Sequence, residues 1–363
     1  MTLRVALVGG PMYDHLYDVF DDAGLDVEVV VHADHPTLNR AVADMLGRGE
    51  RLDLISTHSK YAPSQQEWLL PLDGMVDAGG LAPLAVNLCR FDGRLLCLPR
   101  LIDVRILWYR RDRLDAPPDT WQDVLDRRVA FGFPGRESGL FGTFFELVVG
   151  AGGRLFDGDG SPRMDSPDAL AAAALLAALA ARGPDDLPGW HYDQVDAALL
   201  DGRVDAAGVW PGGWGPIRDA PGGSAATALW PALYPAGPAR RVSYSGCHAW
   251  AIPTTCADVP AATALLTRLV GGEANSLDAA GGSICAHVDV FAAVEPRDER
   301  DALRLQLTAE TIRTAMITYP PHPRFPEVED AGWQQLHDVL RGEVGAAQAV
   351  RRIQEVAEVA LAV

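Results

Sequence analysis

Three charged residues interrupt a stretch of otherwise apolar sequence. Arg100, Asp103 and Arg105 lie between Leu95 and Tyr109, where most neighbours are residues that favour buried strands. A strand with a purely structural role would carry valine or isoleucine at such positions. A carboxylate accepts several hydrogen bonds and a guanidinium donates several, so this group could bind a polar ligand. A structural salt bridge between Asp103 and either arginine is the alternative, and both interpretations stay open.

Two further groups have the composition of a binding site. Trp210 and Trp214 flank a Pro-Gly-Gly turn. A turn this short cannot easily bury both indoles, so we favour Trp214 as a ligand-stacking ring and leave Trp210 open between binding and packing. His58 and Lys60 follow the apolar run 52–56, and Lys60 is the one lysine of the chain. A compact ammonium is not equivalent to a planar guanidinium in a small pocket, although a chance surface lysine is equally consistent.

The motifs of several other site classes are missing from the sequence. No GxGxxG follows the first apolar run, and GxxxxGK[ST], HExxH and GxSxG do not occur. Asp157 and Asp159 have the spacing of the first two ligands of an EF-hand calcium loop, but Pro162 occupies the position where that loop needs glycine. The cysteines are Cys89, Cys97, Cys247, Cys256 and Cys285. They show no CxxC spacing and are expected to be mostly buried free thiols, with pairing of the first two left open. We expect no metal and no organic cofactor.

Length and charge restrict the class of protein. A chain of 363 residues is long enough for two domains. The net charge of −18 opposes binding to nucleic acid or to an anionic bilayer, which both attract basic surfaces. No apolar stretch reaches the roughly 18 residues that span a bilayer. The sequence TLRVALVGG after Met1 lacks the features of a signal peptide, so a cytoplasmic location stays an alternative.

The order of the expected elements indicates an α/β fold with parallel strands. Strands are expected at 3–8, 25–31, 52–56, 104–109, 128–133, 204–210 and 244–253. Helices are expected at 13–23, 37–47, 140–150, 194–200, 259–270, 302–315, 331–340 and 346–362. Two more helices are expected to begin at Asp119 or Thr120 and at the Ser166 cap. In such a fold, ligands bind at the carboxyl ends of the strands.

Several motifs occur in the order typical of one known family. They are the DLI strand before a polar loop, the crossover RLLCLPRLIDVRILWYRRDRLDAPPDTWQDVL, AGGRLFD, DGRVDAAGVWPGGW, the AIP strand with a later GGEA turn, and a last helix. Together they resemble the family 1 extracellular solute-binding proteins of ABC importers, the group that contains the maltose-binding protein. The resemblance covers essentially the whole chain. It departs from the family in the missing leader and in Arg100, which stands where a small or aromatic residue is usual and leaves the ligand class open.

The resemblance implies a two-lobed periplasmic-binding-protein type II fold with three hinge-crossing segments. The lobes would be 1–102 with 248–293 and 103–247 with 294–363, and a ligand cleft would lie between them. The implied function is reversible binding of a carbohydrate or related polar solute, hinge closure, and delivery to a membrane permease by a monomer located outside the cytoplasm. A cytosolic sugar sensor is an alternative. An enzyme is another, since Asp103, Glu137, His58 and Lys60 could meet in a cleft.

The resemblance also implies which residues bind the solute. It places Lys60, Asp103 and Glu137 at polar ligand-contacting positions of the family. Aromatic rings are expected beside them, because sugars combine hydroxyls with apolar ring faces. The expected ligand-binding residues are Tyr13, His58, Ser59, Lys60, Asp103, Glu137, Ser138, Trp210, Trp214, Tyr244 and His248. A helix cap is the alternative role for Glu137 and Ser138, and a satisfied structural histidine is the alternative for His248.

Overall fold

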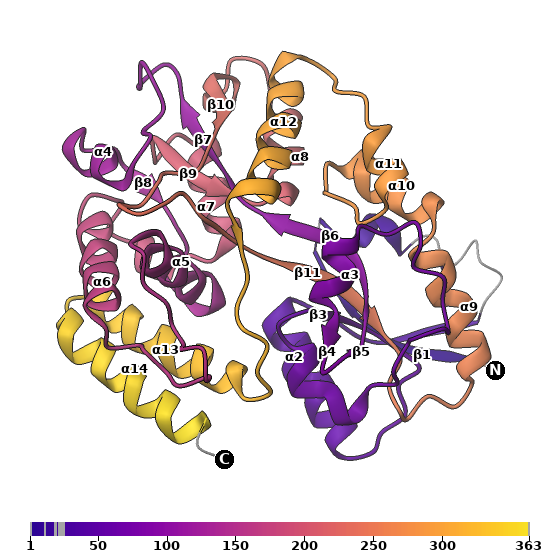
Figure 1. Cartoon of the computed structure of the whole chain (residues 1–363). Coiled ribbons are helices and arrows are strands. Elements are labelled where there is room, and N and C mark those ends of the chain that lie inside the picture. Colours follow the sequence, from indigo (N-terminus) through magenta and orange to yellow (C-terminus); the bar gives the residue numbers. More distant parts are fainter. Residues whose placement is uncertain (1, 11, 18–19, 21–25, 362–363) are drawn as a thin grey trace. The chain divides into compact units, whose positions relative to one another are not determined.

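The computed structural model describes residues 2–10, 12–17, 20 and 26–361. Their contacts group the chain into two compact units (Figure 1). Unit 1 is Met1–Asp103, Gly246–Glu295 and Pro321–Phe325, and unit 2 is Val104–Ser245, Pro296–Pro320 and Pro326–Val363. Within the described residues, no helix is long and apolar enough to cross a membrane.

Unit 1 is an α/β unit in which parallel strands alternate with helices. Its strands are β1 (Leu3–Val8), β2 (Val27–Ala33), β3 (Leu54–His58), β4 (Arg90–Phe91), β5 (Arg94–Leu95) and β6 (Leu98–Val104). Its helices are η1 (Asp14–Leu16), α2 (His35–Gly47), η2 (Ala62–Trp68), α3 (Pro83–Leu88), α9 (Val259–Leu269), α10 (Gly272–Gly281) and α11 (Val288–Ala292). Strand β11 (Ser243–Ala251) begins in unit 2 and continues into unit 1.

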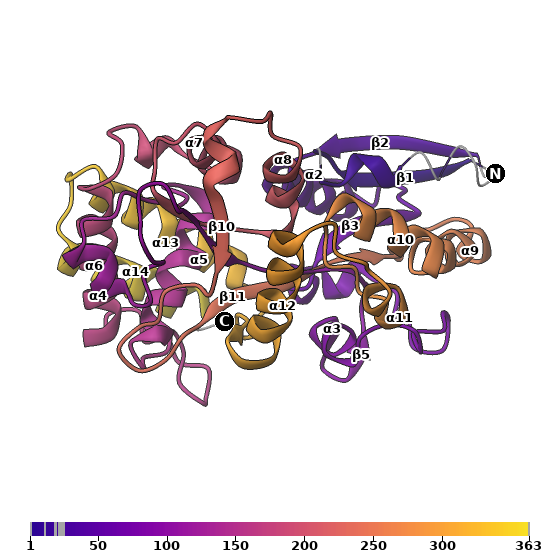
Figure 2. The same ribbon diagram turned by 90° about the horizontal axis from the view of Figure 1, so that it is seen from above.

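In the sheet of unit 1, β1 lies between β3 and the edge strand β2. Strand β1 pairs in parallel with β2 and with β3, and Figure 2 shows β1 and β2 side by side. Strand β3 pairs antiparallel with β11, and β6 joins the other side of β11. Helix α2 packs on β1, β2 and β3 through Leu38, Val42 and Leu46. The parallel arrangement brings the carboxyl ends of β1, β2 and β3 to one edge of the sheet.

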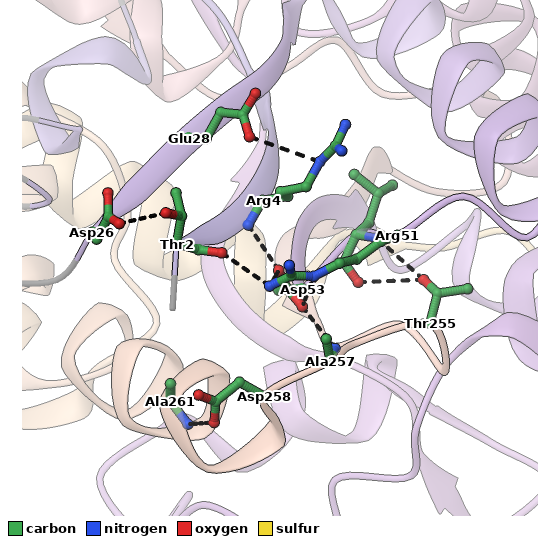
Figure 3. A network of polar contacts seen from close by, with 11 residues as sticks. Thr2, Arg4, Asp26, Glu28, Arg51, Asp53, Thr255, Ala257, Asp258 and Ala261 are labelled. Carbon is green, nitrogen blue, oxygen red and sulfur yellow. Dashed lines mark hydrogen bonds and ion pairs between the residues drawn. The ribbon is translucent and has the colours of Figure 1, made fainter.

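A buried carboxylate ties β1 to the segment before α9. Asp53 is fully buried, and its oxygens accept hydrogen bonds from the backbone N–H groups of Arg4 and Ala257, each at 2.8 Å (Figure 3). Nη2 of Arg51 lies 2.8 Å from the same carboxylate. Burial alone would raise the pKa of Asp53, but these contacts outweigh it, so the net pKa is lowered. The ionised carboxylate therefore fastens three segments together.

Unit 2 carries a smaller sheet with more helices. Its strands are β7 (Ile106–Arg110), β8 (Phe131–Gly132), β9 (Ala206–Val209), β10 (Leu229–Ala232) and β12 (Met316–Ile317). Its longer helices are α4 (Trp121–Asp126), α5 (Glu137–Gly150), α6 (Pro167–Ala180), α7 (Tyr192–Leu200), α8 (Trp214–Arg218), α12 (Glu299–Thr314), α13 (Phe325–Leu340) and α14 (Ala346–Leu361). Short helices are η3 (Leu187–Gly189), η4 (Pro211–Gly213) and η5 (Ala225–Ala228).

Helices pack around the four-stranded sheet of unit 2. The strand order is β10-β7-β9-β8, and β12 pairs separately with the first residues of β11. Helix α12 packs on β10 and β7, while α6 packs between α5 and α14 (Figure 1). Helix α5 is buried on all sides over Gly139–Gly150, which explains its almost uninterrupted apolar sequence. The sheet and α5 thus form a rigid support for the residues that follow β9.

Local sequence signals predicted several boundaries correctly. Thr120 caps α4 in a capping box with Asp123, and Ser166 caps α6 with Pro167 at the first turn. The turn at Asp92-Gly93 is present, and both residues have positive φ, as a tight hairpin requires. The expected helix 13–23 falls partly outside the described residues, and its described part contains the short helix η1 and the helical residue Phe20.

Other boundaries were wrong. The strand expected at 128–133 contains only Phe131–Gly132, because Arg128 has a φ of 52° and cannot lie in a strand. Helix α5 begins at Glu137 rather than Leu140, and Glu137 also has a positive φ, of 56°. The proline-rich segment Pro321–Phe325 groups with unit 1. The division into lobes 1–102 with 248–293 and 103–247 with 294–363 stays a prediction.

Candidate functional site

Three histidines and one aspartate of unit 1 gather where its strands end. His58 is the last residue of β3, and it lies directly opposite His248 on β11. Residues opposite each other on antiparallel strands have neighbouring side chains. Asp103 lies near the end of β6, and His35 opens α2 just after β2. Parallel topology and strand register thus bring four distant sequence positions together.

Hydrogen bonds connect this group through His248. Its Nε2 lies 2.9 Å from Oδ2 of Asp103 and 2.9 Å from the hydroxyl of Tyr13. Its Nδ1 lies 2.5 Å from Nε2 of His35. Nε2 of His58 approaches the same Asp103 oxygen at 3.5 Å. We call His35, His58, Asp103 and His248 the histidine cluster. The expected residues Tyr13, His58, Asp103 and His248 are therefore neighbours.

Burial sets the charge of the histidine cluster. It lowers the pKa of His58 to about 4, and it lowers the pKa of His35 well below its usual range. Burial opposes ionisation of Asp103 too, but attraction and hydrogen bonds from His248 and His58 outweigh it and lower the pKa of Asp103 to about 2. At neutral pH, Asp103 is an anion, while His35 and His58 are neutral.

Ser59 and Lys60 follow the histidine cluster in a tight turn. The hydroxyl of Ser59 accepts a hydrogen bond from the N–H of Cys247 at 3.1 Å, and the Ser59 N–H donates to the Cys247 carbonyl at 2.9 Å. Ser59 thus fastens the turn to β11. The backbone N–H of Lys60 donates to Nδ1 of His58 at 3.2 Å. The Lys60 ammonium lies 4.7 Å from the centroid of the Tyr61 ring.

The two arginines near Asp103 have other partners. Arg100 forms a bidentate pair with Asp278, at 2.9 and 2.8 Å, and both side chains are 2% exposed. Arg105 pairs with Glu146, its Nε lying 3.1 Å from Oε1, in an equally buried setting. Each guanidinium therefore balances a different buried carboxylate. The alternative in which one of them forms a salt bridge with Asp103 is wrong, because histidines surround that carboxylate instead.

A second group of candidate residues lies in unit 2 beside Trp210. The Tyr192 ring meets the Trp210 indole edge-on, with centroids 4.7 Å apart. The Tyr192 hydroxyl lies 3.3 Å from Oγ of Ser138, and Nε2 of His191 lies 3.3 Å from Oε2 of Glu137. We call Glu137, Ser138, His191, Tyr192 and Trp210 the tryptophan cluster. It combines a half-buried aromatic face with a carboxylate and hydroxyls.

Arg105 supports this tryptophan from one side. Its guanidinium carbon lies 4.3 Å from the Trp210 ring centroid, and the pairing with Glu146 fixes the guanidinium in place. A cation over one face holds an indole in a defined orientation. Glu137 adds backbone strain at this cluster, since a positive φ is unfavourable for a residue other than glycine.

Two expected site residues are packed in the interior of unit 2. Trp214 is 2% exposed and stacks on Trp108, so the expectation that Trp214 is the available indole of this turn is wrong. The helical turn η4 directs it inward, whereas Trp210 stays half-buried. Tyr244 is 6% exposed and lies against Tyr319, with ring centroids 4.6 Å apart.

Sequence reasoning missed His35, His191 and Tyr192. His35 follows the carboxyl end of β2, so the rule that pointed to the loop after β3 would also have found it. His191 and Tyr192 precede α7, and only tertiary contact with Trp210 and Glu137 indicates their place.

Solved structures of similar fold include solute-binding proteins with a bound sugar or polyol. Maltose-bound MalE3 of T. maritima superimposes with a TM-score of 0.87 at 20% identity, over 99% of this chain and 100% of that one. A ribitol complex of an ABC transporter solute-binding protein from Agrobacterium radiobacter gives 0.84 at 18% identity, over 99% and 98%. The GacH receptor of Streptomyces glaucescens, solved unliganded and with acarbose, gives 0.84 at 17% identity, over 100% and 99%.

These likenesses establish the two-lobed fold of the periplasmic-binding-protein type, as the sequence predicted. A family model described as bacterial extracellular solute-binding protein matches residues 16–283, which is most of the chain. The chain therefore belongs to the bacterial extracellular solute-binding protein family.

Proposed function

We propose that this protein binds a neutral sugar or polyol outside the cytoplasm and delivers it to the permease of an ABC importer. The observation that carries the proposal is the tryptophan cluster, where an aromatic face held by Arg105 lies beside Glu137 and Ser138. Sugars expose hydroxyls above apolar ring faces, so they are matched by an indole with hydrogen-bonding groups at its edge.

The histidine cluster supports a ligand rich in hydroxyl groups. Asp103 is an anion among imidazoles, and its carboxylate can accept hydrogen bonds from hydroxyls. Tyr13 and Lys60, at the same edge of the sheet, add a phenol and an ammonium. A ligand closes two lobes only by binding the closed form better than the open one, so hinge closure is expected only when the solute is bound.

Charge favours a neutral solute over an acidic one. The guanidinium groups of Arg100 and Arg105 are neutralised by Asp278 and Glu146. In unit 1, an anionic sugar would meet the Asp103 carboxylate, with the Lys60 ammonium at the same edge of the sheet. In unit 2, the Glu137 carboxylate is paired with the Arg136 guanidinium at 2.8 Å. The solutes bound in the similar structures, which are maltose, ribitol and acarbose, carry no anionic group.

A thermal-shift screen tests the proposal. Maltose, ribitol, tagatose and acarbose are compared with glucuronate and glucose 6-phosphate, which are also polyhydroxylated but are anionic. A ligand at 100 times its dissociation constant stabilises the native state by about 2.7 kcal/mol. A neutral saccharide is expected to raise the melting temperature, and calorimetry should then give reversible binding. A shift only with the anionic sugars would refute the charge argument.

Turnover must be checked on the same samples. The solute is expected to be recovered unchanged after prolonged incubation, as judged by NMR of the mixture. Formation of a product would show instead that the clusters perform catalysis, because fold alone does not fix function.

A further inference from the structure

We propose that His58, Asp103 and His248 form a binding site for a divalent transition metal ion, with Zn²⁺ as the ion to test. Each residue offers one potential ligand atom, and these atoms all lie within 4.8 Å of one another. Two imidazoles and a carboxylate are a donor set suited to Zn²⁺, which is held in open sites by three protein ligands. In the described part of the chain, these three form the one group of histidine, cysteine or acidic residues whose potential ligand atoms lie this close together.

The backbone holds the three ligands on strands rather than on loops. His58 and His248 are paired residues of β3 and β11, and Asp103 lies on β6, which also pairs with β11. Their exposed fractions are 7%, 8% and 6%. Ligands on adjacent, buried strands need little rearrangement to converge on one ion, and sites built on such elements are geometrically more exact than sites on loops.

Two imidazole nitrogens already face the same carboxylate oxygen. Nε2 of His248 lies 2.9 Å from Oδ2 of Asp103, and Nε2 of His58 lies 3.5 Å from it. Neighbouring ligand atoms around a tetrahedral Zn²⁺, at bond lengths of about 2.0–2.2 Å, are separated by roughly 3.4 Å. Small movements of the side chains would therefore produce the required spacing.

A second shell is present for His248. Its other ring nitrogen, Nδ1, lies 2.5 Å from Nε2 of His35. Metal-bound histidines usually donate this second N–H to a fixed partner, which sets the tautomer and the ring orientation. His35 is thus a positioning residue. The hydroxyl of Tyr13, 2.9 Å from Nε2 of His248, has to turn aside when an ion takes that lone pair.

Metal binding would break one hydrogen bond of His58. Its Nδ1 accepts a hydrogen bond from the backbone N–H of Lys60 at 3.2 Å. Coordination through Nε2 places the imidazole proton on Nδ1, so this contact must be given up. The alternative is a metal-free network in which His58 and His248 both donate to Asp103, and the experiment below separates the two.

The test is calorimetric titration of ZnCl₂ into the chelator-treated, tag-free full chain, without any sugar. We expect one ion per chain, no comparable binding of MgCl₂, and a visible absorption band of tetrahedral character when Co²⁺ replaces Zn²⁺. His248→Gln, His58→Gln and Asp103→Asn should each weaken binding by about 100-fold or more, and His35→Ala by about 10-fold.

His32→Gln is the matched control. Nε2 of His32 lies 2.8 Å from Asp14 in an exposed histidine–carboxylate pair of the same unit, so it reports nonspecific surface binding. Its zinc affinity should equal that of the wild type. Absence of binding to the wild type, or equal binding by wild type and all three ligand variants, would overturn the proposal. Since the titration contains no sugar, its failure leaves the saccharide screen unaffected.

Discussion

The indole of Trp214 stacks on the indole of Trp108, with ring centroids 5.4 Å apart and an interplanar angle of 20°. Both rings are almost fully buried, at 2% and 1% exposed. The guanidinium carbons of Arg300 and Arg304 lie 5.4 and 5.1 Å from the Trp214 centroid and cover it further. The two tryptophans of one short turn thus have different surroundings, which gives them different predicted roles.

Trp214→Ala is expected to destabilise the protein strongly. Removing a fully buried indole leaves a cavity next to Trp108, and such substitutions cost about 3–5 kcal/mol. Urea unfolding followed by tryptophan-independent circular dichroism measures the effect. Trp210→Ala, at a half-buried ring, should cost clearly less. Equal losses for both variants would contradict the assignment of Trp214 to the interior.

Trp210→Ala is expected to weaken saccharide binding about tenfold, which corresponds to about 1.4 kcal/mol. Calorimetry with maltose, or with the saccharide that gives the largest shift in the screen, measures it. Trp230→Ala is the matched control, because Trp230 is also half-buried in unit 2 and lies under a guanidinium, with Arg111 at 4.4 Å compared with Arg105 at 4.3 Å for Trp210. An equal loss of affinity in both variants would argue against a stacking role.

Glu146→Ala is expected to reduce the free energy of unfolding by about 3–5 kcal/mol, because it leaves the Arg105 guanidinium buried without its counter-ion. Denaturant unfolding at pH 7 measures this loss. The double variant Arg105→Met, Glu146→Leu removes both charges and should recover much of it. A double variant less stable than Glu146→Ala would contradict this explanation. Because Arg105 lies over Trp210, both variants should also lower saccharide affinity.

Asp53 is expected to make stability depend on acidity. Its pKa in the folded state is lowered below the unfolded value of about 3.9, so its stabilisation is complete above that pH and is lost as the pH falls further. Asp53→Asn should cost about 1.5–3 kcal/mol at pH 7 and much less at low pH. Unfolding free energies measured between pH 7 and pH 2 test this.

The control for this series is Asp26→Asn. Asp26 is an exposed carboxylate bonded to Thr2 in the same region (Figure 3), and its replacement should change stability by less than about 0.5 kcal/mol. If both variants showed the same pH profile as the wild type, the buried network around Asp53 would not be the source of the acid sensitivity.

Features determined by a few adjacent residues could be predicted from the sequence. Thr120 with Asp123, Ser166 with Pro167, and the Asp92-Gly93 turn each satisfy backbone groups within four residues of themselves. The loop after β3 was predicted as a site because the carboxyl ends of parallel strands are fixed by topology. The family motifs, spread in order over the chain, supplied the two-lobed architecture.

Features that depend on distant partners could not be predicted. The proximity of His58 and His248 follows from the register between β3 and β11, which no local pattern encodes. The burial of Trp214 depends on Trp108 of strand β7 and on Arg304 of helix α12. The pairing of Arg100 with Asp278 likewise joins residues far apart in sequence. That Asp103 has histidines rather than Arg100 as partners therefore became clear only from the structure.

The position of Lys60 beside Tyr61 has a practical consequence. The chain has one lysine, so reductive methylation with isotope-labelled formaldehyde introduces one side-chain reporter, next to His58. Ring currents from Tyr61 shift the resonance of the methylated Lys60, and a ligand that changes the surroundings of Lys60 would shift or broaden this NMR peak. Occupancy can therefore be followed in solution without introducing a mutation.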